Sequence, residues 1–529
     1  MGPVVDDPAV FPNSDLMSHA KPQVVYQIFP ERFAIGRPHD SRSKLALPAY
    51  QKPGYSLRAW HEPVLREPGS REAAADPGLS FYGGDLQGVT DHLAYLQDLG
   101  ATTLYFTPIF EAPSNHKYDA VSFDRVDPMF GGDAAFATLL SATRERGMGV
   151  VLDAALNHVS FNHPWFLAAR RGESPYRDWF TFLDPKSHAE IHSRDPAVLA
   201  EADYLCWWGH RYMAELRLDA PGLEDLLYRA PGSLLRRFLD QGIQGWRFDT
   251  GQDIGLPFVQ RMRASLQAAY PKAELLGELM NYGGGWVGDD RFTGVMNYYQ
   301  RSAVLGWLSG DVGARQSNAA LRDGYLGSGH EGSLSSWNML ASHDTPRLKH
   351  LLPDWADRRL ALVAQFTLPG IPVIYYGEEN GMDGAGDPDC RRPMEWDPSK
   401  WDGTTREFYR TLIALRQGNP ALGEGRLTVL GDRLDGTDAL VFLRHTGQPG
   451  ETALVVLNRG DRAFDSSLLL PDPHLYSGLR LQDVVGDGSA ELLMGGQTRV
   501  KVPARSAAVF LPDDHLPNFR YFKARNRWA

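Results

Sequence analysis

Cysteine and long apolar runs are both scarce in this sequence. Only two of the 529 residues are cysteine, Cys206 and Cys390. This number rules out a disulfide framework and a thiolate metal site, and it is typical of proteins from a reducing compartment. No uncharged apolar run is long enough to span a bilayer. We therefore expect two free thiols and no membrane association.

Lysine and arginine are in deficit as well. The chain has 54 of them against 65 aspartates and glutamates, a formal net charge of −11. It therefore lacks the basic surface that attracts a nucleic acid, and it suits a neutral ligand. Residues 1–20 carry Asp6, Asp7 and Asp15 and have neither the basic start nor the apolar centre of a secretory signal. They are predicted to be an N-terminal extension, and the protein is predicted to be cytoplasmic.

What the sequence does contain is a series of eight short β-branched or aromatic runs, most of them followed by a helical pattern. The predicted strands are residues 24–30, 102–110, 149–158, 245–250, 275–280, 294–299, 334–344 and 371–379. Helical patterns that end at or near glycine cover residues 86–100, 133–147, 354–370 and 404–418. When parallel strands are joined by right-handed helical crossovers, both faces of their sheet must be covered. Eight such repeats therefore predict an α/β fold, a closed (β/α)8 TIM barrel.

Two stretches do not follow the repeat. Residues 160–229, after the third predicted strand, are too many for a simple crossover and contain several tryptophans, which predicts an inserted lobe beside the site. From residue 420 the pattern changes to short alternating segments separated by Gly, Asp and Pro, which predicts a C-terminal all-β sandwich domain over residues 420–529. The catalytic barrel is then formed by residues 21–159 and 230–419.

Four of the predicted strands end in polar residues, where a barrel of this kind carries its active site. In residues 245–250, strand alternation places Arg247 and Asp249 on the inner face and turns Trp246 and Phe248 outward against helices. The arginine is then expected to keep the aspartate ionised, as a nucleophile requires. Asp249 is therefore the candidate nucleophile.

Glu278 ends the neighbouring predicted strand after two leucines. Partial burial and nearby carboxylates are expected to raise its pKa and keep it protonated as an acid. An acid beside an ionised carboxylate is the pair that glycoside cleavage requires, and a separation of roughly 5–5.5 Å predicts retention through a covalent intermediate. Asp344, with His343, supplies a third carboxylate and a donor for sugar hydroxyls, contacts that strengthen toward the transition state.

Each of these motifs also has a structural interpretation when it is taken singly, as a surface ion pair, a turn or a helix cap. In this order, and at four strand ends, they resemble the four conserved regions of the α-amylase family. The matching segments are residues 153–158 (DAALNH), 245–250 (GWRFDT), 277–278 (GE) and 342–344 (SHD). An inactive sugar-binding scaffold is the alternative from a different class. Against it, the chain keeps Asp249, Glu278 and Asp344.

Further segments are similar to the maltodextrin glucosidase, neopullulanase and cyclomaltodextrinase group, above all to maltodextrin glucosidase. These are residues 24–33 (VVYQIFPERF), 81–86 (FYGGDL), 116–119 (HKYD) and 387–391 (DPDCR). The sugar-binding residues that the resemblance implies are Tyr118, Asp153, His158, Arg247, His343, Asp387 and Arg391. It implies that the tyrosine stacks on the sugar at the cleavage subsite, that the two histidines bind its hydroxyls, and that Asp387 and Arg391 hold the non-reducing side.

The chain departs from the pattern of this group in three respects. The lobe has residues 213–217 (MAELR) where the group usually has Met-Pro-Lys-Leu-Asn, and Gln252 follows the nucleophile where a Lys or His often binds the leaving sugar. Gln252 is therefore a candidate contact on the acceptor side. Enzymes of the group usually begin with an additional β-sandwich domain that often mediates dimer formation, whereas the barrel motif here starts within the first thirty residues. We expect a monomer or a weak homo-oligomer.

No cofactor is expected to be required. His158 and His163 are five residues apart with no third ligand in view, so no catalytic metal is predicted. Asn157 stands where many amylases have a calcium ligand, although a structural asparagine is the simpler interpretation. Residues 383–389 are rich in oxygen but lack the spacing of a recognised calcium loop. The sequence therefore leaves open whether the protein binds a structural calcium ion.

The predicted function is that of an α-glucosidase of carbohydrate metabolism, which hydrolyses maltose and short maltodextrins. The expected binding partner is its substrate, an α-glucan oligosaccharide. Transglycosylation and neopullulanase-like endo-acting hydrolysis stay open as alternatives. Thr250, beside the nucleophile, indicates the linkage: relatives that cleave α-1,6 bonds tend to have Val there, and a hydroxyl bonds an acceptor sugar where a methyl excludes it. We expect a preference for α-1,4 bonds, unless Thr250 merely caps the strand and bonds backbone.

Overall fold

The computed structural model describes residues 22–36, 54–64, 77–183, 204–448 and 450–513. The predicted N-terminal extension, residues 1–20, lies outside the described residues, and so do residues 514–529 of the predicted C-terminal domain. Within the described parts of the chain, no helix combines the length and the apolar character that crossing a bilayer needs.

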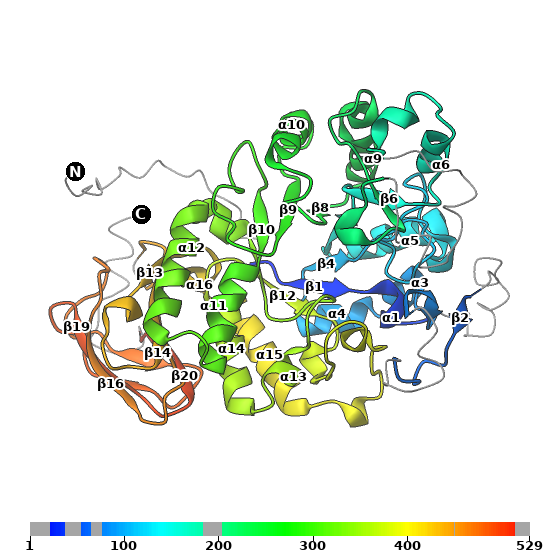
Figure 1. Ribbon diagram of the computed structural model, residues 1–529. Helices are drawn as coiled ribbons and strands as arrows, with labels where there is room; N and C mark the ends of the chain where they lie inside the picture. The colour runs from blue at the N-terminus through cyan, green and yellow to red at the C-terminus, as the bar shows by residue number, and fades with distance from the viewer. Residues whose placement is uncertain (1–21, 37–53, 65–76, 184–203, 449, 514–529) are drawn as a thin grey trace, which may run out of the picture.

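Eight parallel strands close into a barrel, which confirms the predicted fold class (Figure 1). They follow one another around the barrel in chain order, and β12 pairs with β1 to close it. The strands are β1 (Val25–Ile28), β4 (Thr103–Phe106), β5 (Gly149–Ala154), β8 (Gly245–Phe248), β9 (Glu274–Leu279), β10 (Gly294–Asn297), β11 (Trp337–Met339) and β12 (Ile371–Tyr375). Each coincides with one of the eight predicted runs, most of which extend further. Beyond the ends of β5, β8 and β11 the runs include predicted site residues, such as His158, Asp249 and Asp344.

The barrel strands bury both of their faces. Val25, Val151 and Trp337 belong to the apolar cluster that fills the barrel interior, whereas Tyr26 and Val150 belong to the larger cluster shared with the surrounding helices. This alternation follows from the period of two along a strand. Because side chains fill the interior, polar groups gather at the carboxyl ends of the strands.

The helices of the barrel layer begin at identifiable caps. Asp85 accepts a hydrogen bond from the Gly88 amide at the start of α3 (2.6 Å), and Asp354 accepts one from the Ala356 amide at the start of α14 (3.0 Å). The helices are α1 (Pro30–Phe33), α3 (Leu86–Asp91), α4 (Leu93–Leu99), α5 (Gly132–Glu145), α9 (Leu234–Asp240), α10 (Leu256–Gln267), α11 (Tyr298–Ser309), α12 (Ala314–Ser335), α13 (Leu348–Leu351), α14 (Trp355–Thr367) and α15 (Gly403–Gln417).

Two connections differ from the expected repeat. The helix predicted over residues 86–100 is interrupted at His92, which has non-helical backbone angles and separates α3 from α4. No helix joins β9 to β10, since the whole of the connecting segment 280–293 is an irregular loop that contains four glycines.

Between β5 and β8 the chain leaves the barrel and forms the lobe (cyan to green, upper right in Figure 1). Its hairpin pairs β6 (His158–Ser160) with β7 (Met213–Glu215), and α6 (Pro164–Arg170) follows β6. The lobe packs through aromatic rings: the ring centroids of Phe166 and Phe180 are 5.0 Å apart. Because β6 starts only a few residues after β5 ends, the hairpin lies beside the carboxyl end of the barrel.

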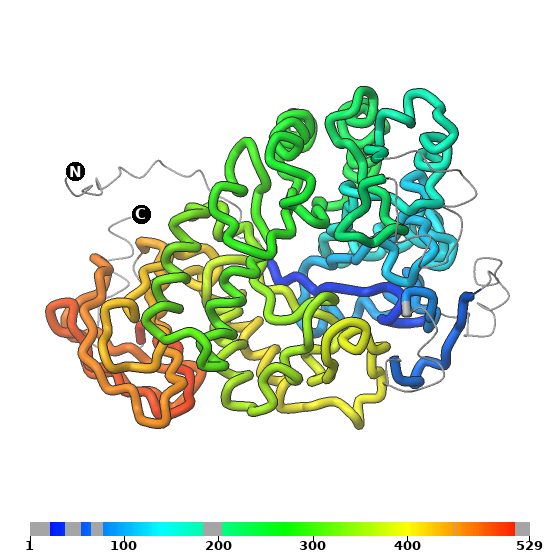
Figure 2. Tube along the Cα trace, in the orientation of Figure 1, coloured from blue at the N-terminus to red at the C-terminus, as the bar shows by residue number. Residues whose placement is uncertain are grey.

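Two antiparallel sheets follow the barrel, as the alternating segments predicted. The larger sheet has the order β13 (Arg426–Val429), β14 (Ala439–His445), β15 (Thr452–Asn458), β20 (Ser506–Pro512) and β17 (Leu481–Asp483). The smaller has β16 (Phe464–Leu469), β19 (Gln497–Val502) and β18 (Ser489–Ala490). Leu454 and Val500 share the apolar core between the two sheets, so they form a sandwich. The other face of the larger sheet, including Phe442, joins the core of the barrel layer, and Figure 2 shows this sheet beside the green helices.

Short elements complete the fold. The strands β2 (Ser56–Leu57) and β3 (Ser80–Phe81) pair outside the barrel, and α16 (Pro420–Glu424) leads into the C-terminal sheets. The segment after β3 begins α3 and therefore ties this small pair to the first barrel crossover.

Candidate active site

A cavity of about 660 Å³ opens where the barrel strands end, between the barrel and the lobe. The predicted site residues that line it are Tyr118, His158, Asp249, Thr250, Gln252, Glu278, Asp344, Asp387 and Arg391. The other three, Asp153, Arg247 and His343, are fully buried and contact residues that line it. The structure therefore brings all of the predicted site residues together, from six different strand ends and loops.

Arg247 joins three carboxyl groups at the floor of the cavity. Its Nη1 lies 2.9 Å from Oδ2 of Asp153 and 2.8 Å from Oδ1 of Asp249, and its Nη2 lies 2.6 Å from Oε1 of Glu278. Trp246, the residue before it, belongs to the outer core cluster, as strand alternation predicts. Asp249 and Glu278 are therefore held side by side by one guanidinium group.

Burial raises the pKa of Asp249 and of Glu278, and ion pairing with Arg247 opposes the rise in both. For Glu278 this is the expected direction. For Asp249 it corrects the expectation that the arginine keeps the pKa low: the contact exists, but loss of solvent around the carboxylate outweighs it, and the charge of Glu278 adds to the rise. Burial also raises the pKa of Asp153. Three carboxyl groups around one cation favour retention of a proton within the cluster.

The backbone turns sharply after Asp249. Thr250 has a φ of +46°, a left-handed conformation that is unusual for a β-branched residue, so it does not continue the strand as residues 245–250 predicted. Its amide donates to Oε2 of Glu278 at 2.9 Å. Its buried hydroxyl has no hydrogen-bond partner within the described part of the chain. The turn therefore fixes the Glu278 carboxylate and leaves the Thr250 hydroxyl without a backbone bond.

A hydrogen-bonded chain beneath the cavity orients Tyr118. Gln27 Nε2 donates to Nδ1 of His343 at 2.8 Å, and burial, with two neighbouring arginines, holds the pKa of His343 well below its ordinary value. The neutral ring then carries its proton on Nε2, which lies 2.6 Å from the Tyr118 hydroxyl. That hydroxyl donates in turn to Oδ2 of Asp153 at 3.0 Å. The rings of Tyr118 and His343 are parallel, with centroids 5.5 Å apart, so the tyrosine is fixed at both its ring and its hydroxyl.

Asp344 and Arg391 both line the cavity and form an ion pair. Oδ1 of Asp344 lies 3.2 Å from Nη2 of Arg391, and its Oδ2 lies 3.2 Å from Nε2 of His343. Nη1 of Arg391 lies 3.2 Å from Oδ1 of Asp387, and its Nε donates to the His343 carbonyl at 2.8 Å. The third carboxylate and the predicted non-reducing-side pair thus form one network.

The lobe supplies an aromatic wall that includes residues absent from the predicted set. His158 stacks on Trp207 with ring centroids 5.3 Å apart, and burial lowers the pKa of His158 to about 4. Trp207 Nε1 donates to Oδ2 of Asp253 at 2.9 Å and so links the lobe to the loop after β8. Asp253 and Trp208 also line the cavity. Asp253 stands four residues after Asp249, a spacing that is visible in the sequence, whereas the positions of Trp207 and Trp208 depend on how the lobe packs.

Two carboxylates among the possible calcium ligands have arginine partners within the protein. Among the described residues, no group of three or more His, Cys, Asp or Glu is arranged to hold a metal ion. In the oxygen-rich segment 383–389, Asp389 pairs with Arg392 and Asp387 pairs with Arg391.

Comparison with known proteins agrees with this geometry. Residues 27–416 match the family model described as alpha amylase, catalytic domain. Neopullulanase 2 of Thermoactinomyces vulgaris is 36% identical over 92% of this chain and 76% of its own length. A cyclomaltodextrinase of a Bacillus species is 36% identical over 86% of this chain and 75% of its own length. The solved structure of the debranching enzyme of Nostoc punctiforme has a TM-score of 0.76 at 28% identity and covers 94% of this chain and 100% of that one. The chain therefore belongs to the α-amylase family and is a glycoside hydrolase similar to neopullulanases and cyclomaltodextrinases.

Proposed function

We propose that this protein is a retaining α-glucosidase that hydrolyses the α-1,4 bonds of maltose and short maltodextrins, with Asp249 as nucleophile and Glu278 as acid/base. The observation that carries the proposal is that both carboxyl groups, from adjacent strands, contact one guanidinium at the cavity floor. Such a pair favours the separation of roughly 5–5.5 Å used for retention over the roughly 6.5–9.5 Å that makes room for an attacking water in inverting enzymes.

In the first step, Oδ2 of Asp249 attacks the anomeric carbon of the bound glucose unit. Oδ1 accepts from Arg247 at 2.8 Å, while Oδ2 accepts no hydrogen bond from the described residues. As the bond from the carbon to Oδ2 forms, the bond to the leaving sugar oxygen breaks, and Glu278 gives its proton to that oxygen. The result is a glycosyl ester on Asp249 and an ionised Glu278.

In the second step, Glu278 takes a proton from water while the water oxygen bonds to the same carbon and the ester bond to Asp249 breaks. Two inversions give overall retention of configuration. Arg247 contacts both carboxylates and offsets the negative charge that each carries in turn. Asp344 and Tyr118 are fixed by neighbours at 3.2 Å or less, so they are preorganised to bind the ring as it flattens.

The nucleophile is tested by covalent labelling. Incubation with a mechanism-based fluoro-glucoside and peptide mapping should place the label on Asp249 alone, and the Asp249→Asn variant should remain folded and unlabelled. A label on another residue would overturn the assignment. First appearance of the β-anomer of glucose in the NMR spectrum of the products would overturn retention.

Transglycosylation and neopullulanase-like hydrolysis form the second candidate. The identity to neopullulanase 2 favours it, and so do the exposed Gln252 and Trp208 at the cavity, which offer contacts to an acceptor sugar. Product analysis separates the two. Glucose as the main product from maltose supports the α-glucosidase, whereas products longer than the substrate, or faster cleavage of pullulan and cyclodextrin than of maltose, would favour the second candidate.

Location and assembly belong to the same proposal. Cys206 and Cys390 are free thiols, which supports a cytoplasmic location because reducing compartments keep thiols unpaired. A monomer or a weak homo-oligomer is proposed, and light scattering of the purified protein at several concentrations tests it.

A further inference from the structure

An exposed tyrosine stands four residues beyond Glu278, on the loop that joins β9 to β10. The side chain of Tyr282 is 42% exposed, and its ring meets that of Tyr299 on α11 edge to face, with centroids 5.1 Å apart. Its hydroxyl donates to the carbonyl of Asp323 on α12 at 3.1 Å. Because the ring and the hydroxyl are both held, this side chain loses little conformational freedom when a ligand binds.

Two glycines make room for the Tyr282 side chain. A Cβ on Gly284 would lie 2.3 Å from the Tyr282 ring, and one on Gly327 would lie 1.8 Å from the Tyr282 hydroxyl. Gly327 belongs to α12, where a glycine costs roughly 1 kcal/mol relative to alanine. The helix therefore has a destabilising residue at the position where a larger one would collide with a side chain that stays partly in solvent.

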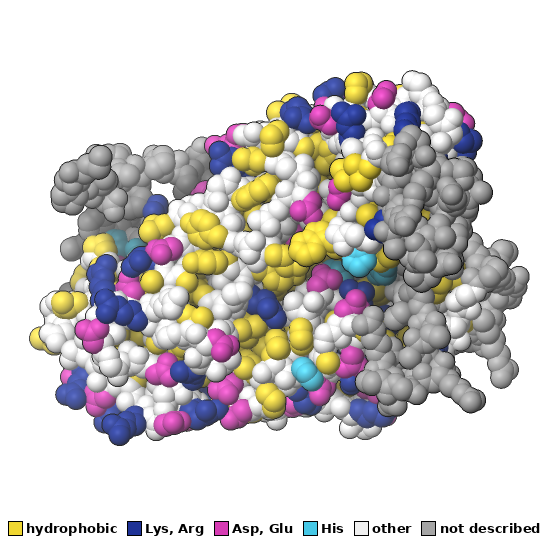
Figure 3. All heavy atoms as spheres, viewed as in Figure 1, with side chains coloured by type: hydrophobic (Ala, Val, Ile, Leu, Met, Phe, Trp, Pro, Cys, Tyr) yellow, Lys and Arg dark blue, Asp and Glu magenta, His cyan; other side chains and the backbone are white. Residues whose placement is uncertain are grey.

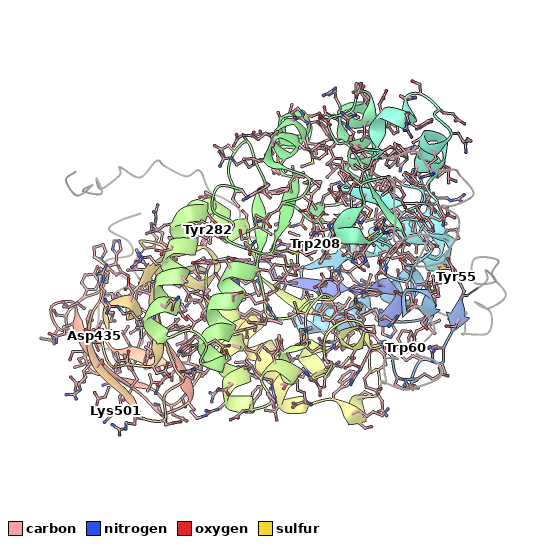
Figure 4. The ribbon with its side chains drawn as sticks, viewed as in Figure 1. Tyr55, Trp60, Trp208, Tyr282, Asp435 and Lys501 are labelled. Carbon is pink, nitrogen blue, oxygen red and sulfur yellow. The ribbon has the colours of Figure 1, made fainter. Side chains whose placement is uncertain are left out.

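The surface around Tyr282 continues into the catalytic cavity. Met280 and Asn281, next to it in the loop, both line the cavity, and Met280 is 50% exposed. Leu326 on α12 is 67% exposed. Figure 3 shows hydrophobic side chains gathered across this face. Figure 4 places Tyr282 over α12 and Trp208 near the lobe on the same face. The loop therefore leads from the cavity outward to the tyrosine.

We propose that Tyr282, braced by Tyr299, is a distal sugar-stacking platform for α-glucan chains that extend out of the cavity past Met280. The inference rests on the proposed function, because the glucan must first occupy the catalytic cavity. A fixed aromatic face binds the apolar face of a glucose ring, and neutral hydroxyl groups need no counter-charge. The ligand class is a linear α-glucan with more glucose units than the cavity holds.

Binding is measured without turnover in the Asp249→Asn background. Isothermal titration calorimetry compares maltoheptaose and maltose on this protein and on the same protein with Tyr282→Ala. Affinity for maltoheptaose should fall roughly fivefold to tenfold, the scale of one aromatic contact, while affinity for maltose changes by less than about twofold. Equal changes for both sugars, or no change for maltoheptaose, would overturn the proposal.

Further variants separate stacking from a folding defect. Tyr282→Phe keeps the ring and should keep the affinity for maltoheptaose, whereas Gly327→Ala displaces the ring and should reproduce the loss. Leu469→Ala on β16 removes another exposed apolar side chain, 72% exposed, and should change neither affinity. A wild-type dimer that Tyr282→Ala dissociates would assign this surface to a second copy and refute the platform. A wild-type protein that cleaves no α-glucan would count against the proposed function instead.

Discussion

The proposed mechanism gives Glu278 two roles, first as acid and then as base. Both of its oxygens have donors, Arg247 on one and the Thr250 amide on the other, and burial raises its pKa. A raised pKa keeps the acid protonated above its ordinary range, and activity is then lost as the pH rises through the raised value.

Replacement of Glu278 by Gln keeps the size of the side chain and removes the proton. We expect kcat/KM on maltose to fall by roughly 10² to 10⁴. The loss on glucosyl fluoride should be much smaller, because fluoride leaves without protonation. Steady-state kinetics on both substrates, at several pH values, should also show that the alkaline limb of the profile disappears. Equal losses on the two substrates would argue against the acid role.

The Thr250 side chain tests the predicted linkage preference. Its hydroxyl is buried without a partner among the described residues, so Thr250→Val removes a polar group but keeps the branched shape. Wild type should cleave maltose faster than isomaltose by about tenfold or more, and the variant should narrow or reverse that ratio.

The measurement is kcat/KM on maltose and isomaltose for both proteins, with the thermal midpoint as a control. An unpartnered hydroxyl predicts an unchanged or higher midpoint for Thr250→Val. A wild type that prefers isomaltose would refute the linkage preference and leave the retaining mechanism untouched.

At this scale, sequence reasoning found the residues whose chemistry is visible in a motif and missed those that depend on packing. Asp249, Glu278 and Asp344 stand at strand ends, where periodicity and topology place them. Gln27 shares the inner face of β1 with Val25, but nothing local shows that it orients His343. The rise in the pKa of Asp249 could not be predicted either, since it depends on how completely the folded protein buries the carboxylate.

At the scale of elements, α6 offers a pH test of the lobe. His163 caps this helix, since its Nδ1 accepts from the Trp165 amide at 3.1 Å, and burial lowers the pKa of His163 to about 3 from 6.5. The unfolded chain therefore binds a proton below pH 6.5 that the folded chain excludes. The contribution of neutral His163 to the free energy of unfolding is therefore fully present above pH 6.5 and is lost as the pH falls toward 3.

Replacement of His163 by Asn keeps a capping acceptor and removes the titration. Two pH units below 6.5, the free energy of unfolding of the wild type should have fallen by roughly 3 kcal/mol more than that of the variant. Thermal midpoints at pH 7 and pH 4.5 measure this difference. The half-exposed His350, replaced in the same way, is the matched control. If acidification lowers the midpoints of wild type and His163→Asn equally, the claim that His163 stays neutral in the folded protein is wrong.

The elements themselves were predictable where burial is uniform. The barrel strands are short apolar runs between helices, and all eight were found in this way. The interruption at His92 and the irregular loop 280–293 were not predicted, because their conformations depend on local hydrogen bonds and on neighbouring side chains. The His92 ring, for example, bonds the Gly88 carbonyl one turn earlier at 2.7 Å. That same irregular loop carries Tyr282.

At the scale of the whole molecule, the barrel and the C-terminal sheets share one core. Phe442 and Val455 of the larger sheet belong to the same apolar cluster as Leu360 of α14. Trp307 of α11 donates to Asp438 at 2.9 Å just before β14. The change in composition at residue 420 lies shortly before the first strand of the sheets, β13, which begins at Arg426, but composition carries no information about this shared face. The two parts should therefore unfold together.

Asn318 of α12 is the residue on which this coupling can be tested. It is fully buried. Its Nδ2 donates to the Ala439 carbonyl at 2.9 Å, and its Oδ1 accepts from the Val441 amide at 3.1 Å, so one side chain bonds two backbone groups on the same edge of β14. Asn318→Ala leaves two buried backbone groups without partners, which should cost roughly 2–4 kcal/mol.

Calorimetry should show one unfolding transition for wild type and one at lower temperature for Asn318→Ala. The kcat on maltose at 25 °C should be unchanged, because the residue does not line the cavity. Gln241→Ala, which removes an exposed side chain bonded only within its own segment, is the matched control and should leave the midpoint in place. Two separated transitions in the wild type would show that the barrel and the sheets unfold independently. If they share one core, the loss of the Asn318 amide that joins them lowers the stability of both parts together.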